Sequence, residues 1–275
     1  MRSLRSLAVS GAAIVFTGVV FIIPFLFILL QAVKNPEESR SLSFAWPSEF
    51  PIMDNLRQVF EARDYMLVIA FINSTVLTVA SVALMVVLGA MVAYVLQRRA
   101  SRVNGAVHSL VLMGLIIPPA VVPTVWVMQK LSLFKTMSGM ILIEVAFGLA
   151  FCVLLFRAFI GSIPKDLDEA AMIDGAGPIR LFFRVIFPLL RPVIVTVIVV
   201  QSVFVFNDFQ NPLYFFPGDA NATVQLTTYN FKSQFTTAYN LLFMNILLVT
   251  IPPLIAYMIF QRQIVAGMTS GAVKG

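Results

Sequence analysis

The fold follows from uncharged apolar runs, the first of which reads LAVSGAAIVFTGVVFIIPFLFILLQAV at residues 7–33. A helix that crosses a membrane needs about 20 mostly apolar residues. The apolar core of a secretory signal peptide has only about 7 to 15 residues and ends at a small-residue cleavage site, which does not follow this run. We therefore expect residues 7–33 to form a first, uncleaved membrane span.

Five further apolar runs follow, each long enough to cross a membrane. They cover residues 65–96, 106–128, 138–159, 185–209 and 241–260. Six spans and their connectors use most of the 275 residues and leave no room for a separate soluble module. The sequence therefore predicts an all-α polytopic membrane protein of six transmembrane helices, with residues 1–275 as a single transmembrane domain.

Prolines interrupt several of these runs: Pro24, Pro118, Pro119, Pro123, Pro252 and Pro253. Each removes a backbone donor and tends to kink or break a helix. Such breaks are tolerated in lipid where neighbouring protein satisfies the freed carbonyl groups. The prolines therefore predict helices that pack against other helices, although ordinary kinks are an alternative reading.

Lys and Arg residues in the short connecting loops predict the orientation, because cytoplasmic loops carry an excess of both. The larger share of the 19 Lys and Arg residues lies on one side, at Arg2, Arg5, Arg98, Arg99, Arg102, Arg157, Lys165, Arg180, Arg184, Arg191, Arg262 and Lys274. We expect that side to be cytoplasmic. Both termini are then cytoplasmic, as an even number of spans requires.

Composition supports a membrane protein and excludes other classes. The chain is 59% hydrophobic and 12% charged, with a mean hydropathy of +0.92, whereas soluble domains have about 25% charged residues. The net charge of +6 comes from short basic clusters and not from one basic face, which argues against nucleic acid. The single cysteine, Cys152, and the single histidine, His108, predict no disulfide framework and no metal site.

The most polar stretch of the predicted cytoplasmic side is GSIPKDLDEAAMIDGAGP at residues 161–178. Its pattern predicts a short capped helix, with Asp166 as N-cap, Glu169 as its capping-box partner and Gly175 as the left-handed residue that ends the helix. A second helix, 179–187, is expected after Pro178. Together these residues form a predicted loop unit, 161–188.

Helical spacing places four residues of this stretch on one face: Leu167, Ala170, Ala171 and Asp174. Two alanines on a face allow another backbone to approach closely. Such a face is suited to docking into a groove of a partner.

The segment resembles the EAA motif of permease subunits of bacterial ABC importers. The resemblance rests on Glu169-Ala170-Ala171, on Gly175, and on Val185, Phe187 and Pro188, with Val and Phe in place of the usual Ile and Leu. Further similarity covers nearly the whole chain and indicates the carbohydrate class, similar to the G subunit of maltose systems. It is carried by Asn73-Ser74, Ile163-Pro164, residues 173–176, residues 206–209, with Phe206 where tryptophan is usual, and residues 267–275.

The resemblance implies a permease subunit in the bacterial inner membrane, which pairs with a second permease as a heterodimer. Two ATPase subunits would carry ATP and Mg²⁺, an extracytoplasmic binding protein would deliver the sugar, and this chain would hold no cofactor. The implied ATPase-coupling residues are Leu167, Glu169, Ala170, Ala171, Asp174 and Gly175. The loop 212–240, with a turn at 218–221, would reach into the binding protein, and the tail 268–275 would insert between the ATPases.

A substrate path is expected at the outer end of the fifth predicted span. Its polar candidates there are Asn207, Asp208, Gln210 and Asn211, which are interleaved with Phe206, Phe209 and Tyr214; a further candidate, Asn73, lies at the start of the second predicted span. A neutral polyol needs such amides and aromatic faces, although a belt of aromatic residues at the membrane interface is an equal alternative. Glu144 is the one acidic residue well inside a predicted span, which marks it as a functional candidate or as a structural residue near the interface.

Three alternative functions remain at this point. The first is an ABC permease for a phosphorylated polyol or another polar solute. The second is a stand-alone ion-coupled carrier, for which only Glu144 and Asp208 qualify as ion ligands and which leaves the capped helix unexplained. The third is a membrane enzyme, but the sequence has no recognisable catalytic set and no Gly-x-x-x-x-Gly-Lys-Ser/Thr phosphate loop.

Overall fold

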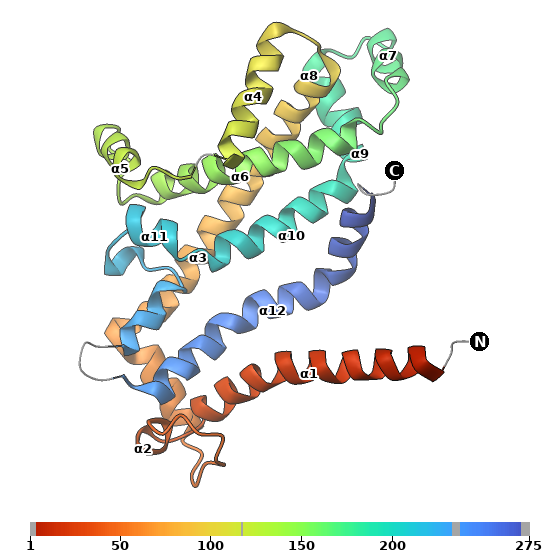
Figure 1. Ribbon diagram of the computed structural model, residues 1–275. Helices are drawn as coiled ribbons and strands as arrows, with labels where there is room; N and C mark the ends of the chain where they lie inside the picture. The colour runs from red at the N-terminus through yellow and green to blue at the C-terminus, as the bar shows by residue number, and fades with distance from the viewer. Residues whose placement is uncertain (1–3, 117, 233–236, 271–275) are drawn as a thin grey trace. The chain divides into compact units, whose positions relative to one another are not determined.

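The computed structural model describes residues 4–116, 118–232 and 237–270, and their regular structure is helical, as predicted (Figure 1). The long helices and the short ones between them are α1 (Leu4–Ala32), α2 (Pro36–Ser39), α3 (Ile52–Arg98), α4 (Arg102–Ile116), α5 (Val121–Lys130), α6 (Met137–Ile160), α7 (Asp166–Ile173), α8 (Pro178–Leu181), α9 (Phe187–Leu189), α10 (Arg191–Asn207), α11 (Gln210–Phe215) and α12 (Tyr239–Ser270). A π-helical turn, η1 (Phe182–Ile186), and two 3-10 turns, η2 (Asp219–Asn221) and η3 (Leu226–Phe231), complete the described part.

Four described helices are long and apolar enough to cross a membrane. They contain the segments Ser10–Ala32, Ile52–Arg98, Met137–Ile160 and Tyr239–Gln261. Two bent pairs, α4 with α5 and the segment Pro178–Leu189 with α10, raise the number to six if each pair is one span. The structure therefore has between four and six candidate spans within the described residues, and it is a multi-pass membrane protein.

The bent pairs lie at two of the predicted spans, 106–128 and 185–209. Pro118 and Pro119 lie between the end of α4 and the start of α5, and proline disfavours helical backbone in the residue before it. The predicted span 185–209 is likewise divided, because the segment Pro178–Leu189 meets α10 at 76°. A break beside Pro118 and Pro119 is what these prolines are expected to cause, and the bounds of the six predicted spans stay predictions.

Helix α3 starts earlier than the predicted span 65–96. Its backbone is not helical from Ala62 to Tyr65, and Arg63, Asp64 and Tyr65 all have positive φ. Residues with a side chain rarely adopt this conformation. The break at Arg63 and Asp64 thus separates a polar first segment of α3, residues 52–61, from the apolar segment that corresponds to the predicted span 65–96.

The chain divides into two compact units, Met1–Val68 with Leu226–Pro252, and Ile69–Gln225 with Pro253–Gly275. In the first unit, the buried Asn55 side chain donates hydrogen bonds to the carbonyl groups of Ala32 and Lys34, both at 2.9 Å, and accepts one from Asn240 at 2.8 Å. Phe27 packs edge-on against Phe243. The prediction of one domain over 1–275 stays a prediction.

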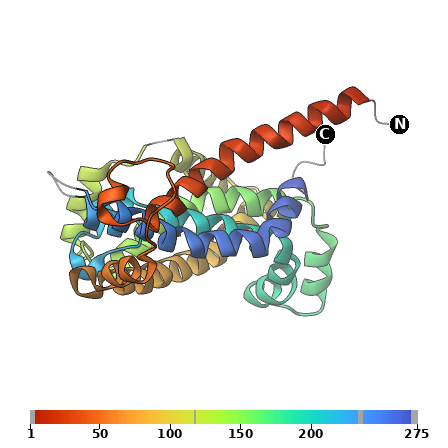
Figure 2. The ribbon, with the colours of Figure 1, turned by 90° about the horizontal axis from the view of Figure 1, so that it is seen from below.

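The second unit has its hydrophobic core around α6. Figures 1 and 2 show α6 and α10 side by side, with α7, α8 and α9 at one end. Cys152 of α6 approaches Gly89 of α3 so closely that a Cβ atom on the glycine would lie 3.0 Å from the Cys152 Cβ. At the end of α6, Arg157 bonds Gln97 of α3 at 3.1 Å and His108 of α4 at 2.8 Å. These contacts join three helices.

A substitution at Gly139, in the first turn of α6, tests this packing. A Cβ atom there would lie 2.0 Å from the Leu133 carbonyl oxygen, a backbone atom. We expect Gly139→Ala to lower the free energy of unfolding by about 1–3 kcal/mol through overpacking. Reaction of the buried Cys152 thiol with a thiol-reactive dye during heating in detergent measures the unfolding midpoint.

Gly105→Ala in α4 is the matched control, because a Cβ atom at Gly105 has no neighbour within 4 Å. We expect it to be neutral or to stabilise the helix by up to about 1 kcal/mol. Equal midpoints for the two variants would contradict the close approach at Gly139.

Candidate functional site

Helix α7 ends in a hydrogen-bonded turn built on Gly175. The Gly175 amide donates to the Met172 carbonyl at 3.0 Å, and the Ala176 amide donates to the Ala171 carbonyl at 2.9 Å. This pair of bonds defines a Schellman motif, which needs a left-handed residue. Gly175 has a φ of 80°, as the sequence predicts. The helix therefore ends abruptly and leaves few free carbonyl groups.

The start of α7 differs from the prediction. Asp166 is the first helical residue, Lys165 precedes it with helical backbone angles, and no side chain caps the helix. The predicted capping box of Asp166 and Glu169 is therefore wrong. Lys165 instead offers its carbonyl group to the amides of Asp168 and Glu169 at 2.9 and 3.2 Å. The three carboxylates of the first turn still face the positive end of the helix dipole.

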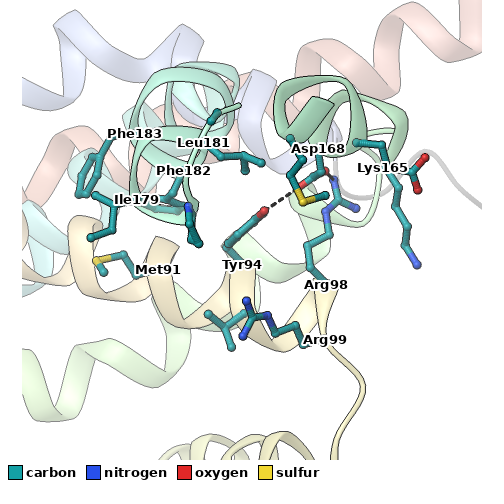
Figure 3. A pocket seen from close by; sticks show the side chains of 15 residues that line it. Met91, Tyr94, Arg98, Arg99, Lys165, Asp168, Ile179, Leu181, Phe182 and Phe183 are labelled. Atoms are coloured by element: carbon teal, nitrogen blue, oxygen red, sulfur yellow. Dashed lines mark hydrogen bonds and ion pairs between the residues drawn. The ribbon is translucent and has the colours of Figure 1, made fainter. Parts of the chain in front are cut away.

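Asp168 fastens α7 to the end of α3 (Figure 3). The residue is only 6% exposed. Its carboxylate forms an ion pair with Arg98 Nη2 at 2.9 Å and accepts a hydrogen bond from the Tyr94 hydroxyl at 2.6 Å. Arg98 Nη2 also donates to the Ile163 carbonyl at 3.1 Å. The ion pair lacks hydrogen-bond geometry, but together with the short bond from Tyr94 it joins α7 to α3 at a buried point.

Sequence reasoning missed Asp168, Arg98 and Tyr94 as a group. Their contact is not local, since Tyr94 and Asp168 are 74 positions apart. One signal was present in the sequence. Three acidic residues lie in the first turn of α7, and two arginines, Arg98 and Arg99, lie at the end of α3. The buried member of that acidic turn cannot be distinguished from the exposed ones without the fold.

The predicted coupling residues divide between two faces of α7. Leu167, Glu169, Ala170, Asp174 and Gly175 are exposed. Ala171 is only 9% exposed and packs into the core of its unit. Ala171 is therefore not exposed beside Leu167, Ala170 and Asp174, and its part in ATPase coupling stays a prediction.

The outer face of α7 exposes large apolar side chains. Ile173 is 86% exposed, and Leu167 and Met172 are exposed as well. We name the exposed residues Leu167, Glu169, Ala170, Ile173 and Asp174 the outer face of α7. Exposed apolar groups rimmed by charges are typical of protein contact surfaces.

Beside α7 lies a cavity of about 500 Å³, shown in Figure 3. One part of its lining is basic, with Arg98, Arg99 and Lys165, and another is apolar. The aromatic rings of Phe182 and Phe183 stack edge-on at 5.0 Å, and Phe182 lies 5.6 Å from the Tyr94 ring. These rings pack η1 against the same end of α3 that holds Asp168.

A second cavity, of about 650 Å³, lies at the junction of α10 and α11. Three predicted path residues, Asn207, Asp208 and Asn211, line it together. Two buried residues that the prediction did not join to them, Glu144 of α6 and Gln201 of α10, line it as well. We name these five residues, with Phe147, Phe151 and Phe204, the outer cavity. Glu144 thus lies where a substrate path is expected, and spacing alone does not reveal this because it comes from another helix.

Two predicted path residues lie elsewhere. The Asn73 amide donates to the carbonyl groups of Ala220 and Ala222, both at 3.0 Å, and so holds the loop after α11. Gln210 does not line the outer cavity; its backbone amide donates to Asp208 Oδ1 at 2.8 Å, in a turn that starts α11. Their assignment to a substrate path stays a prediction.

The predicted turn at 218–221 is present. Gly218 has a φ of 127°, and the Asn221 amide donates to its carbonyl group at 3.0 Å. Part of the predicted loop 212–240, at residues 233–236, lies outside the described residues. The same holds for residues 271–275 of the predicted tail 268–275.

The helices and the two cavities define a multi-pass membrane protein with a rigid polar helix outside its apolar segments. Residues 85–270 match the family model of the binding-protein-dependent transport system inner membrane component, and the chain belongs to this family. It is a permease subunit of a transport system.

Similar proteins are also permease subunits by name. The chain is similar to the melibiose/raffinose/stachyose import permease protein MelC of Bacillus subtilis, with 32% identity over 92% of this chain and 91% of the relative. It is 35% identical to the trehalose transport system permease protein SugB of Mycobacterium tuberculosis, over 81% of this chain and 82% of the relative. A solved bacterial ABC transporter involved in import of the acidic polysaccharide alginate shares the fold, with a TM-score of 0.81, 18% identity, and coverage of 95% of this chain and 98% of the other.

Removal of one partner tests the buried ion pair. We expect Arg98→Met to lower the free energy of unfolding by about 3–5 kcal/mol, because Asp168 stays buried without its countercharge. We expect Asp168→Asn to lower the free energy of unfolding as well, because Arg98 then loses its countercharge. Both variants also expose the segment 161–178 to limited proteolysis in membranes.

Asp166→Asn is the matched control, since it is the same substitution in the same helix at an exposed position. The double variant Arg98→Met/Asp168→Leu should recover part of the stability, because an apolar pair carries no desolvation penalty. Equal proteolysis of the Asp166 and Asp168 variants would show that the ion pair does not fasten α7.

Proposed function

We propose that this chain forms half of the translocation path of an ATP-driven importer for a sugar or oligosaccharide. Membership of the family supports the importer. The substrate class is supported by the names of two relatives, a melibiose/raffinose/stachyose import permease and a trehalose transport system permease. The alternative substrate is a phosphorylated polyol or another polar solute. A panel of solutes separates the two.

The observation that carries the mechanism is the division of α7 into a fastened face and an outer face. The Arg98–Asp168 pair joins one side to α3, while Ile173 and Glu169 remain exposed on the other. A partner that grips the outer face therefore moves α7 and α3 together. The required property is rigidity and not reactivity, which a short helix with a Schellman end provides.

The partner at the outer face is proposed to be one of two ATPase subunits, which hold ATP and Mg²⁺. Closure of the ATPases upon ATP binding would push α7, and α3 would transmit the movement to the outer cavity. A second permease completes the path as a heterodimer, and an external binding protein delivers the sugar. For the binding protein alone, support comes from a structure with the same fold, described as a bacterial alginate ABC transporter in complex with an alginate pentasaccharide-bound periplasmic protein, with a TM-score of 0.68 and 16% identity.

The proposed setting is the bacterial inner membrane, with six spans and both termini in the cytoplasm. Reporter fusions test this topology. We expect cytoplasmic signals after residues 100 and 165 and external signals after residues 45 and 220. A cytoplasmic signal at 220 would contradict the proposed orientation and, with it, the place of the outer cavity.

Two substitutions test the proposal that α7 acts as a lever, a rigid helix through which the ATPase moves α3. We expect Glu169→Lys to reduce uptake about tenfold or more, because reversal of the charge removes a charge-assisted contact worth about 1.5–3 kcal/mol. We expect Gly175→Val to reduce uptake as well. Position 175 has a left-handed φ, which costs a residue with a side chain about 1–2 kcal/mol. The measurement is ATP-driven uptake of a sugar panel by the complex with its partner subunits in proteoliposomes, together with ATPase activity.

Gly177→Ala is the control for Gly175. Both positions have open space around a Cβ atom, but only Gly175 has a positive φ. Gly177→Ala should transport normally. Unchanged uptake in the Glu169 and Gly175 variants would reject the lever, and uptake without any ATPase would reject the importer.

A further inference from the structure

The outer cavity contains a buried carboxyl group with an oxygen that lacks a partner. Glu144 is 5% exposed and lines the cavity. Its Oε1 atom has no hydrogen-bond partner among the described residues. A buried polar atom without a hydrogen bond costs free energy. A ligand that donates a hydrogen bond to Oε1 would remove this cost.

Neighbouring polar groups are already engaged and hold the cavity in shape. Asp208 Oδ1 accepts from the amides of Gln210 at 2.8 Å and Asn211 at 3.2 Å. Asn207 donates to the Val203 carbonyl at 2.8 Å and accepts from Gln225 at 2.9 Å. The cavity is therefore built from internally fixed side chains, with Glu144 Oε1 as an acceptor left free.

The remaining lining combines phenylalanine with amides. Phe147, Phe151 and Phe204 lie in the same cavity as Gln201, which is 5% exposed. Apolar ring faces match the C–H faces of a pyranose, and amides match its hydroxyl groups. The volume of about 650 Å³ falls within the range of about 300–1,000 Å³ for small-ligand sites.

The ionisable side chains that line the outer cavity are all acidic among the described residues. Glu144 and Asp208 both line the cavity, and the lining includes no Lys or Arg among the described residues. An anionic ligand would meet the negative charge that this pair of carboxyl groups carries and no countercharge, in surroundings where charges are weakly screened. Repulsion of this kind discriminates between ligands as effectively as attraction does.

We propose that the outer cavity is a subsite for one uncharged, hydroxyl-rich sugar unit, with Glu144 Oε1 accepting from a sugar hydroxyl and the Glu144–Asp208 pair excluding anionic units. This inference rests on the proposed import of sugars and adds to it a place and a rule of selection. Uronates and sugar phosphates are then poor substrates. The phosphorylated-polyol alternative is disfavoured by the same charges.

The test uses the full chain with its partner subunits in proteoliposomes. Uptake is measured for melibiose, raffinose and trehalose as uncharged probes, and for trehalose 6-phosphate and digalacturonate as anionic probes. Binding of the same labelled probes to the detergent-purified complex, without the binding protein, separates the subsite from the selectivity of the binding protein. Quantities of each variant in the membrane are matched by immunoblot.

We expect Glu144→Leu to lower binding and uptake of the uncharged probe about tenfold or more, and Glu144→Gln, which keeps an acceptor oxygen, to lower them less. The double variant Glu144→Gln/Asp208→Asn should raise binding of an anionic probe relative to its uncharged counterpart about tenfold. Asn at 208 can still start α11, since Asn and Asp cap helices equally well. Glu37→Gln, at an exposed carboxylate of α2, is the matched control and should change nothing.

Three results would overturn the inference. If the Leu variant and the double variant keep the wild-type affinities and the wild-type ratio of uncharged to anionic probes, the cavity is no subsite, while sugar import stands. If wild-type uptake depends on Na⁺ or a proton gradient and Glu144→Gln removes only that dependence, Glu144 serves an ion. If the wild type imports no sugar but drives another solute with ATP, the proposed sugar substrate fails together with the subsite.

Discussion

The buried pair of Arg98 and Asp168 is the constraint on which the α7 end of the second unit depends. An ion pair of this kind contributes little net stability, because desolvation offsets most of the Coulomb attraction. Its value lies in geometry: Asp168 accepts a hydrogen bond from Tyr94 and forms the ion pair with Arg98, which also donates to the Ile163 carbonyl. The start of α7 is thereby fixed in position and in rotation about its own axis.

The rest of the site follows from this anchoring. Once Asp168 faces inward, Ala171 faces the core, and Glu169 and Ile173 must face outward. The turn at Gly175 and the ring packing of Phe182 against Tyr94 then lead the chain back to the membrane through η1. A force applied to the outer face of α7, as proposed for the ATPase, would therefore reach α3 through the buried contact of Asp168.

Features that depend on neighbours in sequence were predictable, and those that depend on distant residues were not. The long apolar runs and the left-handed Gly175 follow from local rules of length and backbone conformation. The Arg98–Asp168 contact and the meeting of Glu144 with Asp208 require the packing of separate helices. Prolines lie beside both breaks, near Pro118 and after Pro188. The hydropathy of the sequence does not reveal these breaks, because the two helices of each bent pair form one continuous apolar run.

The opposite orientations of Asp168 and Glu169 have a consequence for the length of this segment. Adjacent helical residues point about 100° apart, so one carboxylate lies against Arg98 while its neighbour remains exposed. An inserted or deleted residue between Pro164 and Asp168 would turn the helix by that angle and exchange the two roles. The segment can thus accept changes of residue type on its outer face far more readily than any change in its number of residues.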